Sequence, residues 1–111
     1  MTATACISHR TAEHTTVARV PGPALELGEG TYLPLAGAVT HIGRGFHADV
    51  QLDDHSVSQR HAVLVDSPVG MILLDDTSTN GTFVNGRRTT RALLAPGDEI
   101  RLGRVALRYT A

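Results

Sequence analysis

The sequence predicts an all-β domain, either a sandwich or a barrel, and two observations carry this prediction. Short apolar runs alternate with turn signals from about residue 24 to residue 109, at the spacing typical of small all-β folds. No segment shows the 3.6-residue apolar period of a long amphipathic helix. With 111 residues, the chain is long enough for one domain with a buried core.

Residues 1–20 are predicted to form a flexible tail in front of the folded domain, residues 21–111. The tail is rich in Thr, Ala, His and Ser, has no apolar period and ends at Pro21-Gly22-Pro23. It lacks the apolar core of a signal peptide, and no run in the chain approaches the length that spans a bilayer. We therefore expect a soluble, cytoplasmic protein without membrane contact.

Nine strands are expected in the domain, each bounded by turn-forming residues. They cover residues 24–27, 31–35, 39–42, 50–52, 62–66, 71–74, 82–84, 99–102 and 105–109. A loop with Pro and Gly, residues 67–70, predicts a hairpin, and Gly103-Arg104 predicts another in which apolar residues alternate with Arg. Leu93 and Leu94 are expected to attach the loop of residues 92–97, which precedes the last hairpin, to the core.

Two Asn-Gly turns, Asn80-Gly81 and Asn85-Gly86, lie close together within residues 75–86. Asn and Gly both tolerate positive φ, so the spacing predicts a compact loop at the rim of a sheet. Hydroxyls and an amide in this loop could bind an oxyanion, or they could hold the loop together through local hydrogen bonds. The side chains concerned are Ser78, Thr79, Thr82 and Asn80.

The composition argues against a nucleic-acid or membrane surface, because both need a basic field. The chain has ten Arg, no Lys and eleven acidic residues, for a net charge of −1. The use of Arg in place of Lys is typical of a GC-rich bacterial genome. Cys6 is the single cysteine, which excludes a disulfide framework and a thiolate metal cage, and no cofactor is expected.

Further polar groups stand at the ends of predicted strands. They are Gly43-Arg44-Gly45, Asp53-Asp54 and Ser58-Gln59-Arg60-His61. In a sandwich, loops of this kind gather at one pole. An Arg, a Ser and the loop around Asn80 could therefore converge on one ligand.

Five blocks of the sequence resemble the forkhead-associated (FHA) domain, and together they span about residue 24 to residue 109. The blocks are Gly43-Arg44, Asp49-Val50-Gln51-Leu52-Asp53, Val57-Ser58-Gln59-Arg60-His61-Ala62, residues 74–86, and Leu94 with residues 97–103. The resemblance is specific because all five occur in the right order at compatible spacing. It implies an FHA/SMAD-like β-sandwich of two twisted, mainly antiparallel sheets, which binds a phosphothreonine peptide and performs no chemistry.

The resemblance also implies roles for individual residues. Arg44 and Ser58 would bind the phosphate, Gln59 the phosphate or the peptide backbone, Thr79 the phosphate or its pocket, and Asn80 the peptide main chain. Gly43, His61 and Gly81 would be architectural. The expected partners are threonine-phosphorylated proteins, among them a Ser/Thr protein kinase.

Position 59 departs from the family pattern, which often has Arg, Lys or Asn there. Gln59 donates through its amide without a charge, so the phosphate would bind somewhat more weakly unless Arg60 turns in. Arg60 is therefore a secondary candidate, whose alternative role is that of a solvated strand-end Arg.

Other interpretations of the same residues stay open at this stage. The sandwich could be a phosphate-independent protein-binding scaffold. Ser58 and His61 could form a hydrolase triad with Asp53, Asp54 or Asp66, although the Gly-x-Ser-x-Gly elbow is absent. The histidines suggest a metal site, but their spacing fits no ligand frame, so no metal is expected.

Two surface features have both a functional and a solvent-related interpretation. Arg87, Arg88 and Arg91 form a basic group that either keeps the surface soluble or favours acidic residues beside a phosphothreonine. Thr15 and Thr16 are candidates for phosphorylation. A phosphorylated tail could then occupy the site of its own domain as a tethered ligand, or the two threonines are incidental to a disordered tail.

Overall fold

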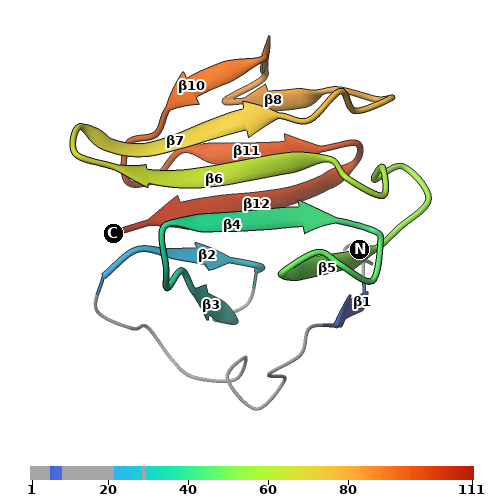
Figure 1. Ribbon diagram of the computed structural model, residues 1–111, viewed down its shortest axis with the longest axis horizontal. Helices are drawn as coiled ribbons and strands as arrows, with labels where there is room; N and C mark the ends of the chain where they lie inside the picture. Colours follow the sequence, from blue (N-terminus) through green and yellow to red (C-terminus); the bar gives the residue numbers. More distant parts are fainter. Residues whose placement is uncertain (1–5, 9–21, 29) are drawn as a thin grey trace.

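A computed structural model describes residues 6–8, 22–28 and 30–111. These residues form two six-stranded sheets (Figure 1). The strands of the first sheet, in spatial order, are β1 (Cys6–Ser8), β5 (Val50–Asp53), β4 (Val39–Gly43), β6 (Ala62–Ser67), β7 (Gly70–Asp75) and β10 (Arg91–Leu93). Those of the second are β3 (Tyr32–Pro34), β2 (Ala24–Glu26), β12 (Val105–Thr110), β11 (Glu99–Leu102), β8 (Thr82–Val84) and β9 (Arg87–Thr89). Only β4 and β5 pair in parallel among the described strands.

The core lies between the two sheets, where each strand contributes alternate residues. Val105, Leu107 and Tyr109 of β12 are buried, while the intervening Ala106 and Arg108 are exposed. The largest fully buried apolar side chains come from both sheets: Leu25, Ile42, Leu52, Leu64, Leu73, Ile100 and Leu102. This period-two burial confirms the all-β sandwich with mainly antiparallel sheets.

All nine predicted strands are present, and three further strands were missed. The hairpin of β6 and β7 is tighter than expected, because Ser67 pairs with Gly70 and leaves only two residues in the turn. The missed strands β1, β9 and β10 all lie at an edge of their sheet, and β9 and β10 carry Arg residues. Such strands need no long apolar alternation, and their Arg residues are typical of protected edges.

The prediction of one compact loop over residues 75–86 is wrong in its second half. Residues 76–81 do form a loop, but β8 and β9 form a hairpin whose two turn residues are Asn85 and Gly86. Both have positive φ, 51° and 84°, as a type I′ turn requires. The same Asn-Gly signal therefore marks a loop at one position and a hairpin at the other.

Two smaller predictions also need correction. Leu94 is buried in the core, but Leu93 on β10 is 58% exposed and does not pin the loop. Within the predicted tail, β1 pairs with β5 in antiparallel register, Cys6 opposite Asp53. The other residues of that tail, including Thr15 and Thr16, lie outside the described residues, so the boundary of the tail and its phosphorylation stay predictions.

Candidate functional site

Two loops of the first sheet are joined to each other at one end of the sandwich. The backbone N–H of Arg44 donates to the carbonyl of Ser58 (2.9 Å), and that of Gly45 donates to the carbonyl of Gln59 (3.1 Å). A Cβ atom on Gly43 would stand 2.1 Å from the Gln59 carbonyl oxygen. Only glycine allows this approach, which agrees with the architectural role expected for Gly43.

Arg44 is held so that its guanidinium can act on a ligand. Its Nε donates to the carbonyl of Val57 (2.9 Å), and its own carbonyl accepts from Nε2 of Gln51 (3.0 Å). Within the described residues, its two terminal nitrogens have no protein partner. The planar guanidinium is anchored through Nε, so the N–H groups of its terminal nitrogens can donate hydrogen bonds to an anion.

His61 is fully buried and connects two of the site loops. Its Nδ1 accepts the backbone N–H of Ser58 (3.0 Å), and its Nε2 lies 2.8 Å from the carbonyl oxygen of Gly81. Nε2 therefore carries the proton and donates it to that carbonyl. Burial lowers the pKa of His61, although the hydrogen bond to Gly81 and the charge of Asp75 partly oppose this, so the ring is neutral at pH 7.

This geometry also argues against a hydrolase triad. Both ring nitrogens of His61 are engaged by backbone groups, and neither is hydrogen-bonded to Oγ of Ser58. A general base must reach the proton that it removes. The His61 ring therefore links the β5–β6 loop to the β7–β8 loop through backbone groups.

The Ser58 hydroxyl connects the β5–β6 loop to the β7–β8 loop. Its Oγ accepts the backbone N–H of Thr79 (3.0 Å). In the part of the chain that the structure describes, the hydroxyl hydrogen has no acceptor and is available to a ligand. Thr79 is exposed beside it. The structure thus brings together Arg44, Ser58 and Thr79, three of the predicted binding residues.

The shape of the β7–β8 loop depends on Asp75, which the sequence analysis did not single out. Its carboxylate accepts hydrogen bonds from the Ser78 hydroxyl, the Ser78 N–H (3.2 Å) and Thr82 Oγ1 (2.7 Å). Burial would raise the pKa of Asp75, but the bonds from Ser78 and Thr82 outweigh it and hold the pKa below its usual value. The hydroxyls of Ser78 and Thr82 therefore serve the loop, and that of Thr79 remains for a ligand.

Ser56 is a second residue that the sequence analysis missed. Its carbonyl accepts from Nδ2 of Asn80 (2.9 Å), and its Oγ accepts the N–H of Arg104 (2.9 Å) from the β11–β12 turn. Hydrogen bonds from Ser56, followed by the charge of Arg104, lower the pKa of Asp54, whose carboxylate lies 3.4 Å from Arg104 Nε. An Asx turn at Asp54 was the available sequence signal.

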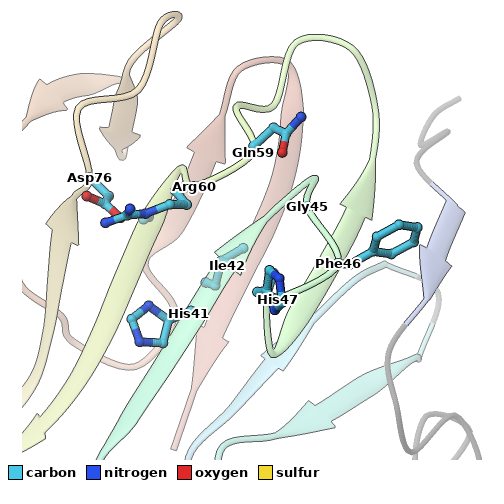
Figure 2. A pocket seen from close by; sticks show the side chains of 10 residues that line it. His41, Ile42, Gly45, Phe46, His47, Gln59, Arg60 and Asp76 are labelled. Atoms are coloured by element: carbon cyan, nitrogen blue, oxygen red, sulfur yellow. The ribbon is translucent and has the colours of Figure 1, made fainter.

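A cavity of about 400 Å³ lies beside these loops (Figure 2). It is lined by His41, Ile42, Gly45, Phe46, His47, Ala48, Gln59, Arg60, Ala62 and Asp76. Arg60 and Asp76 lie side by side at its edge, with 3.3 Å between Nε and Oδ2. Arg60 is highly exposed and pairs with Asp76, and no hydrogen bond joins it to Arg44 or Ser58 in the described residues.

The metal interpretation finds no support in the described residues, which contain no group of three or more His, Cys, Asp or Glu side chains able to hold an ion. Nor do these residues include a helix long and apolar enough to cross a bilayer.

The sequence matches the FHA domain family over residues 40–103, and the chain belongs to this family. Its fold is shared with the FhaA FHA domain solved in complex with the intracellular domain of Rv3910, at a TM-score of 0.74 and 37% identity, covering 79% of this chain and 99% of that one. EmbR of Mycobacterium tuberculosis, solved with a low-affinity phosphopeptide, superimposes with a TM-score of 0.75 and 33% identity over 79% of this chain and 24% of its own.

Several curated relatives are mycobacterial, in line with the bacterial origin expected from the composition. The ABC transporter ATP-binding/permease protein Rv1747 of M. tuberculosis is 44% identical over 71 residues, 64% of this chain and 8% of the transporter. The glycogen accumulation regulator GarA of the same species is 38% identical over 78 residues, 70% of this chain and 48% of the regulator. The chain thus spans less than half the length of these relatives.

Proposed function

We propose that this chain is a binding module for threonine-phosphorylated proteins, acting in the cytoplasm downstream of a Ser/Thr protein kinase and without catalysis of its own. The observation that carries this proposal is the convergence of Arg44, Ser58 and Thr79 on one side of the joined loops. Ser58 Oγ and the Thr79 N–H are linked by a 3.0 Å hydrogen bond. Arg44 donates to the carbonyl of Val57 through Nε and to the carbonyl of Ser58 through its backbone N–H.

A phosphorylated threonine suits these groups chemically. It carries close to two negative charges and three acceptor oxygens, which call for a cationic fork and short hydroxyl donors. Arg44 supplies the fork, and Ser58 and Thr79 supply the hydroxyls. Gln59 adds an uncharged amide where a cation would bind more strongly.

The main chain of a bound peptide would be recognised by Asn80. Its Nδ2 is already committed to the carbonyl of Ser56, which fixes the orientation of the amide. The amide oxygen then remains to accept an N–H from an extended peptide. Loss of this contact would weaken the binding of every peptide to a similar degree, because the peptide backbone is the same whatever the peptide sequence.

Relatives support the assignment. An FHA domain that is 36% identical, with a TM-score of 0.75 over 80% of this chain and 95% of its own, is described by its phosphothreonine-dependent interactions. EmbR was solved with a phosphopeptide and FhaA with the intracellular domain of another protein. We extend phosphothreonine binding to this chain because its own loops present the required donors.

The test is titration calorimetry with a matched pair of peptides that differ only in phosphorylation of one threonine, selected from a phosphothreonine peptide library. We expect binding of the phosphorylated form alone. Each charge-assisted hydrogen bond contributes roughly 1.5–3 kcal/mol, so Arg44→Ala and Ser58→Ala should each weaken binding by about one to two orders of magnitude.

Arg108→Ala is the matched control, since Arg108 donates to the carbonyl of Gly97, away from the site loops. It should bind like the wild type. Equal affinity for phosphorylated and unphosphorylated peptides would instead support the phosphate-independent scaffold.

A further inference from the structure

The outer face of the second sheet carries two arginines on either side of an aromatic ring, close to the candidate site. Phe83 on β8 is paired with Arg88 on β9 and with Arg101 on β11. Thr82, Ile100 and Leu102 are fully buried on the inner face, so the alternation of strands turns Phe83 and Arg101 outward. Directly opposed residues share a face, which places Arg88 there as well.

Arg88 reaches from its strand to the β7–β8 loop. A Cβ atom on Gly81 would lie 3.0 Å from Arg88 Nε and 3.2 Å from its Cζ. The guanidinium therefore rests against Gly81, immediately after Asn80. Gly81 has a φ of 93°, and its lack of a side chain is what lets the cation come this close.

These two cations lack the acidic partners that other arginines near the site have. Arg60 pairs with Asp76 at 3.3 Å, and Arg104 pairs with Asp54 at 3.4 Å. In the described part of the chain, neither Arg88 nor Arg101 has an ion-pair or side-chain hydrogen-bond partner. Their charges are therefore uncompensated at the edge of the candidate site.

Glu99 is the acid that precedes Arg101 by two residues on the same strand and face. It stands opposite Arg108, toward the end of β11 away from the Gly103 turn. It makes no ion pair with either Arg88 or Arg101. The end of this face that borders the site loop thus holds positive charge around an apolar ring.

We propose that Arg88, supported by Arg101, forms a subsite for an acidic side chain of the phosphorylated partner. This inference rests on the function proposed above and names a feature of the partner: a carboxylate near the phosphothreonine. A guanidinium binds a carboxylate through paired N–H···O bonds. The phosphate of the same peptide would bind on the other side of the β7–β8 loop, at Arg44 and Ser58.

The fold limits how far the carboxylate can be from the phosphothreonine. Gly81 follows Thr79 by two residues, and Thr79 is bonded to Ser58. Two residues span at most about 7 Å. An extended peptide advances about 3.3 Å per residue. Allowing for the reach of both side chains, the acidic residue lies about two to four positions from the phosphothreonine.

Arg87 and Arg91 do not belong to this subsite. Arg87 is paired with Val84, which packs against the core, so its side chain leaves β9 on the other side from that of Arg88. Arg91 lies on β10 in the other sheet, opposite Leu74. The basic group expected from the sequence is therefore divided, and Arg88 is the member that contacts the site loop.

The experiment measures affinities for a series of phosphothreonine peptides in which each flanking position is changed in turn from Ala to Glu. We expect Glu at one or two positions to improve binding by about three- to tenfold at low salt, as for partly exposed charge pairs. Arg88→Gln should abolish this gain while affinity for the all-Ala peptide stays within about twofold. Arg87→Gln removes the same charge one residue away and should keep the gain.

Arg88→Glu sharpens the test, because it should reverse the preference toward peptides with Lys at the same position. If Arg88 variants fail to fold, Arg101→Gln should lower the gain in part. Failure of the wild type to bind any phosphothreonine peptide would overturn the proposed function itself. Phosphothreonine binding without a Glu preference, or equal loss of preference in Arg87→Gln and Arg88→Gln, would overturn the subsite alone.

Discussion

Asn80-Gly81 and Asn85-Gly86 are the same dipeptide, yet the protein uses them in different ways. In Asn85-Gly86 both residues have positive φ, and they close the hairpin of β8 and β9. The Asn85 side chain bonds Asp98 Oδ1 (3.0 Å) and accepts the N–H of Glu99 (3.0 Å), so it holds the turn to the neighbouring strand. No atom comes within 4 Å of a Cβ placed on Gly86.

At the first dipeptide only Gly81 has positive φ. Asn80 bonds the carbonyl of Ser56 in another loop, and the Gly81 carbonyl accepts from buried His61. Arg88 lies against Gly81 as well. The second turn therefore connects two strands, whereas the first joins the β7–β8 loop to the β5–β6 loop of the candidate site and to Arg88 on β9. The Asn-Gly sequence predicts that the chain turns. The contacts around the turn determine whether it joins two strands or supports the site.

The largest expected effect comes from removing the residue that ties the first turn down. His61→Ala opens a cavity, leaves the Ser58 N–H without its acceptor and leaves the Gly81 carbonyl with only the long bond from the Gly103 N–H (3.4 Å). The free energy of unfolding should therefore fall by roughly 3–5 kcal/mol. Urea denaturation measures it. His61→Gln retains a donor and an acceptor and should lose less. A loss below about 1 kcal/mol in His61→Ala would show that His61 does not hold the two loops together.

Alanine at the two glycines separates the turns by their surroundings. Gly86→Ala adds only the strain of positive φ, about 1–2 kcal/mol. Gly81→Ala adds the displacement of Arg88 and of Phe83, whose Cε1 would be 3.1 Å from the new Cβ, and should cost about 1 kcal/mol more. In an Arg88→Ala background, part of that excess should disappear, as a double-mutant cycle would detect. Equal costs for both glycines in the wild-type background would contradict the comparison.

Alanine at the two asparagines should separate binding from stability. Asn80→Ala removes the proposed contact to the peptide main chain and should weaken phosphopeptide binding by about tenfold. It also removes one exposed bond, to the Ser56 carbonyl, so its loss of stability should be smaller than that of Asn85→Ala. Asn85→Ala removes two side-chain hydrogen bonds and a residue suited to positive φ, which should lower the free energy of unfolding by about 1–2 kcal/mol without changing affinity. Calorimetry and thermal denaturation of both variants test the pair, and the reverse pattern would show that the roles are assigned the wrong way round.

Mild acid should have the smallest effect, and it should act on the first turn. Burial lowers the pKa of His61 below the ordinary value of 6.5, so the unfolded chain takes up this proton at a higher pH than the folded protein does. The contribution of neutral His61 is therefore complete above about pH 6.5 and declines as the pH falls below it, by at most about 1.4 kcal/mol per pH unit. Asp75, with its lowered pKa, adds acid sensitivity only below about pH 4.

Unfolding free energies at pH 7.5 and 5.5 measure this contribution, and His61→Gln corrects for the other histidines. An unchanged difference between wild type and His61→Gln at the two pH values would contradict the assigned burial of a neutral ring.

Strand prediction succeeded where one face of a strand had to be apolar. The alternation in β11 and β12 is written directly in the sequence, because inward residues must be buried and outward ones can be charged. The edge strands β9 and β10 escaped prediction for the opposite reason. Each pairs along one side only and contributes few core residues, so its sequence carries little of that alternation.

The sequence identified the residues that we propose to face the ligand, and it did not identify the residues that support them. Arg44, Ser58 and Asn80 stand at strand ends and match the family pattern, so their convergence was foreseeable. Ser56 and Asp75 were missed because they act through bonds to partners in other segments. Ser56, for example, accepts from a residue 48 positions further along the chain.

The sequence by itself determined an all-β fold with polar residues at the strand ends, because burial periodicity and turn chemistry are local properties. Its five motif blocks, through their resemblance to the FHA family, added the sandwich and the location of the site. Only the tertiary structure decided that the two identical Asn-Gly turns have different surroundings. It also decided that Arg88 contacts Gly81 while Arg87 leaves β9 on the other side, and that Arg60 pairs with Asp76. Those outcomes depend on strand register and on contacts between residues distant in sequence. Neither is encoded by the preference of any one residue for its own backbone conformation.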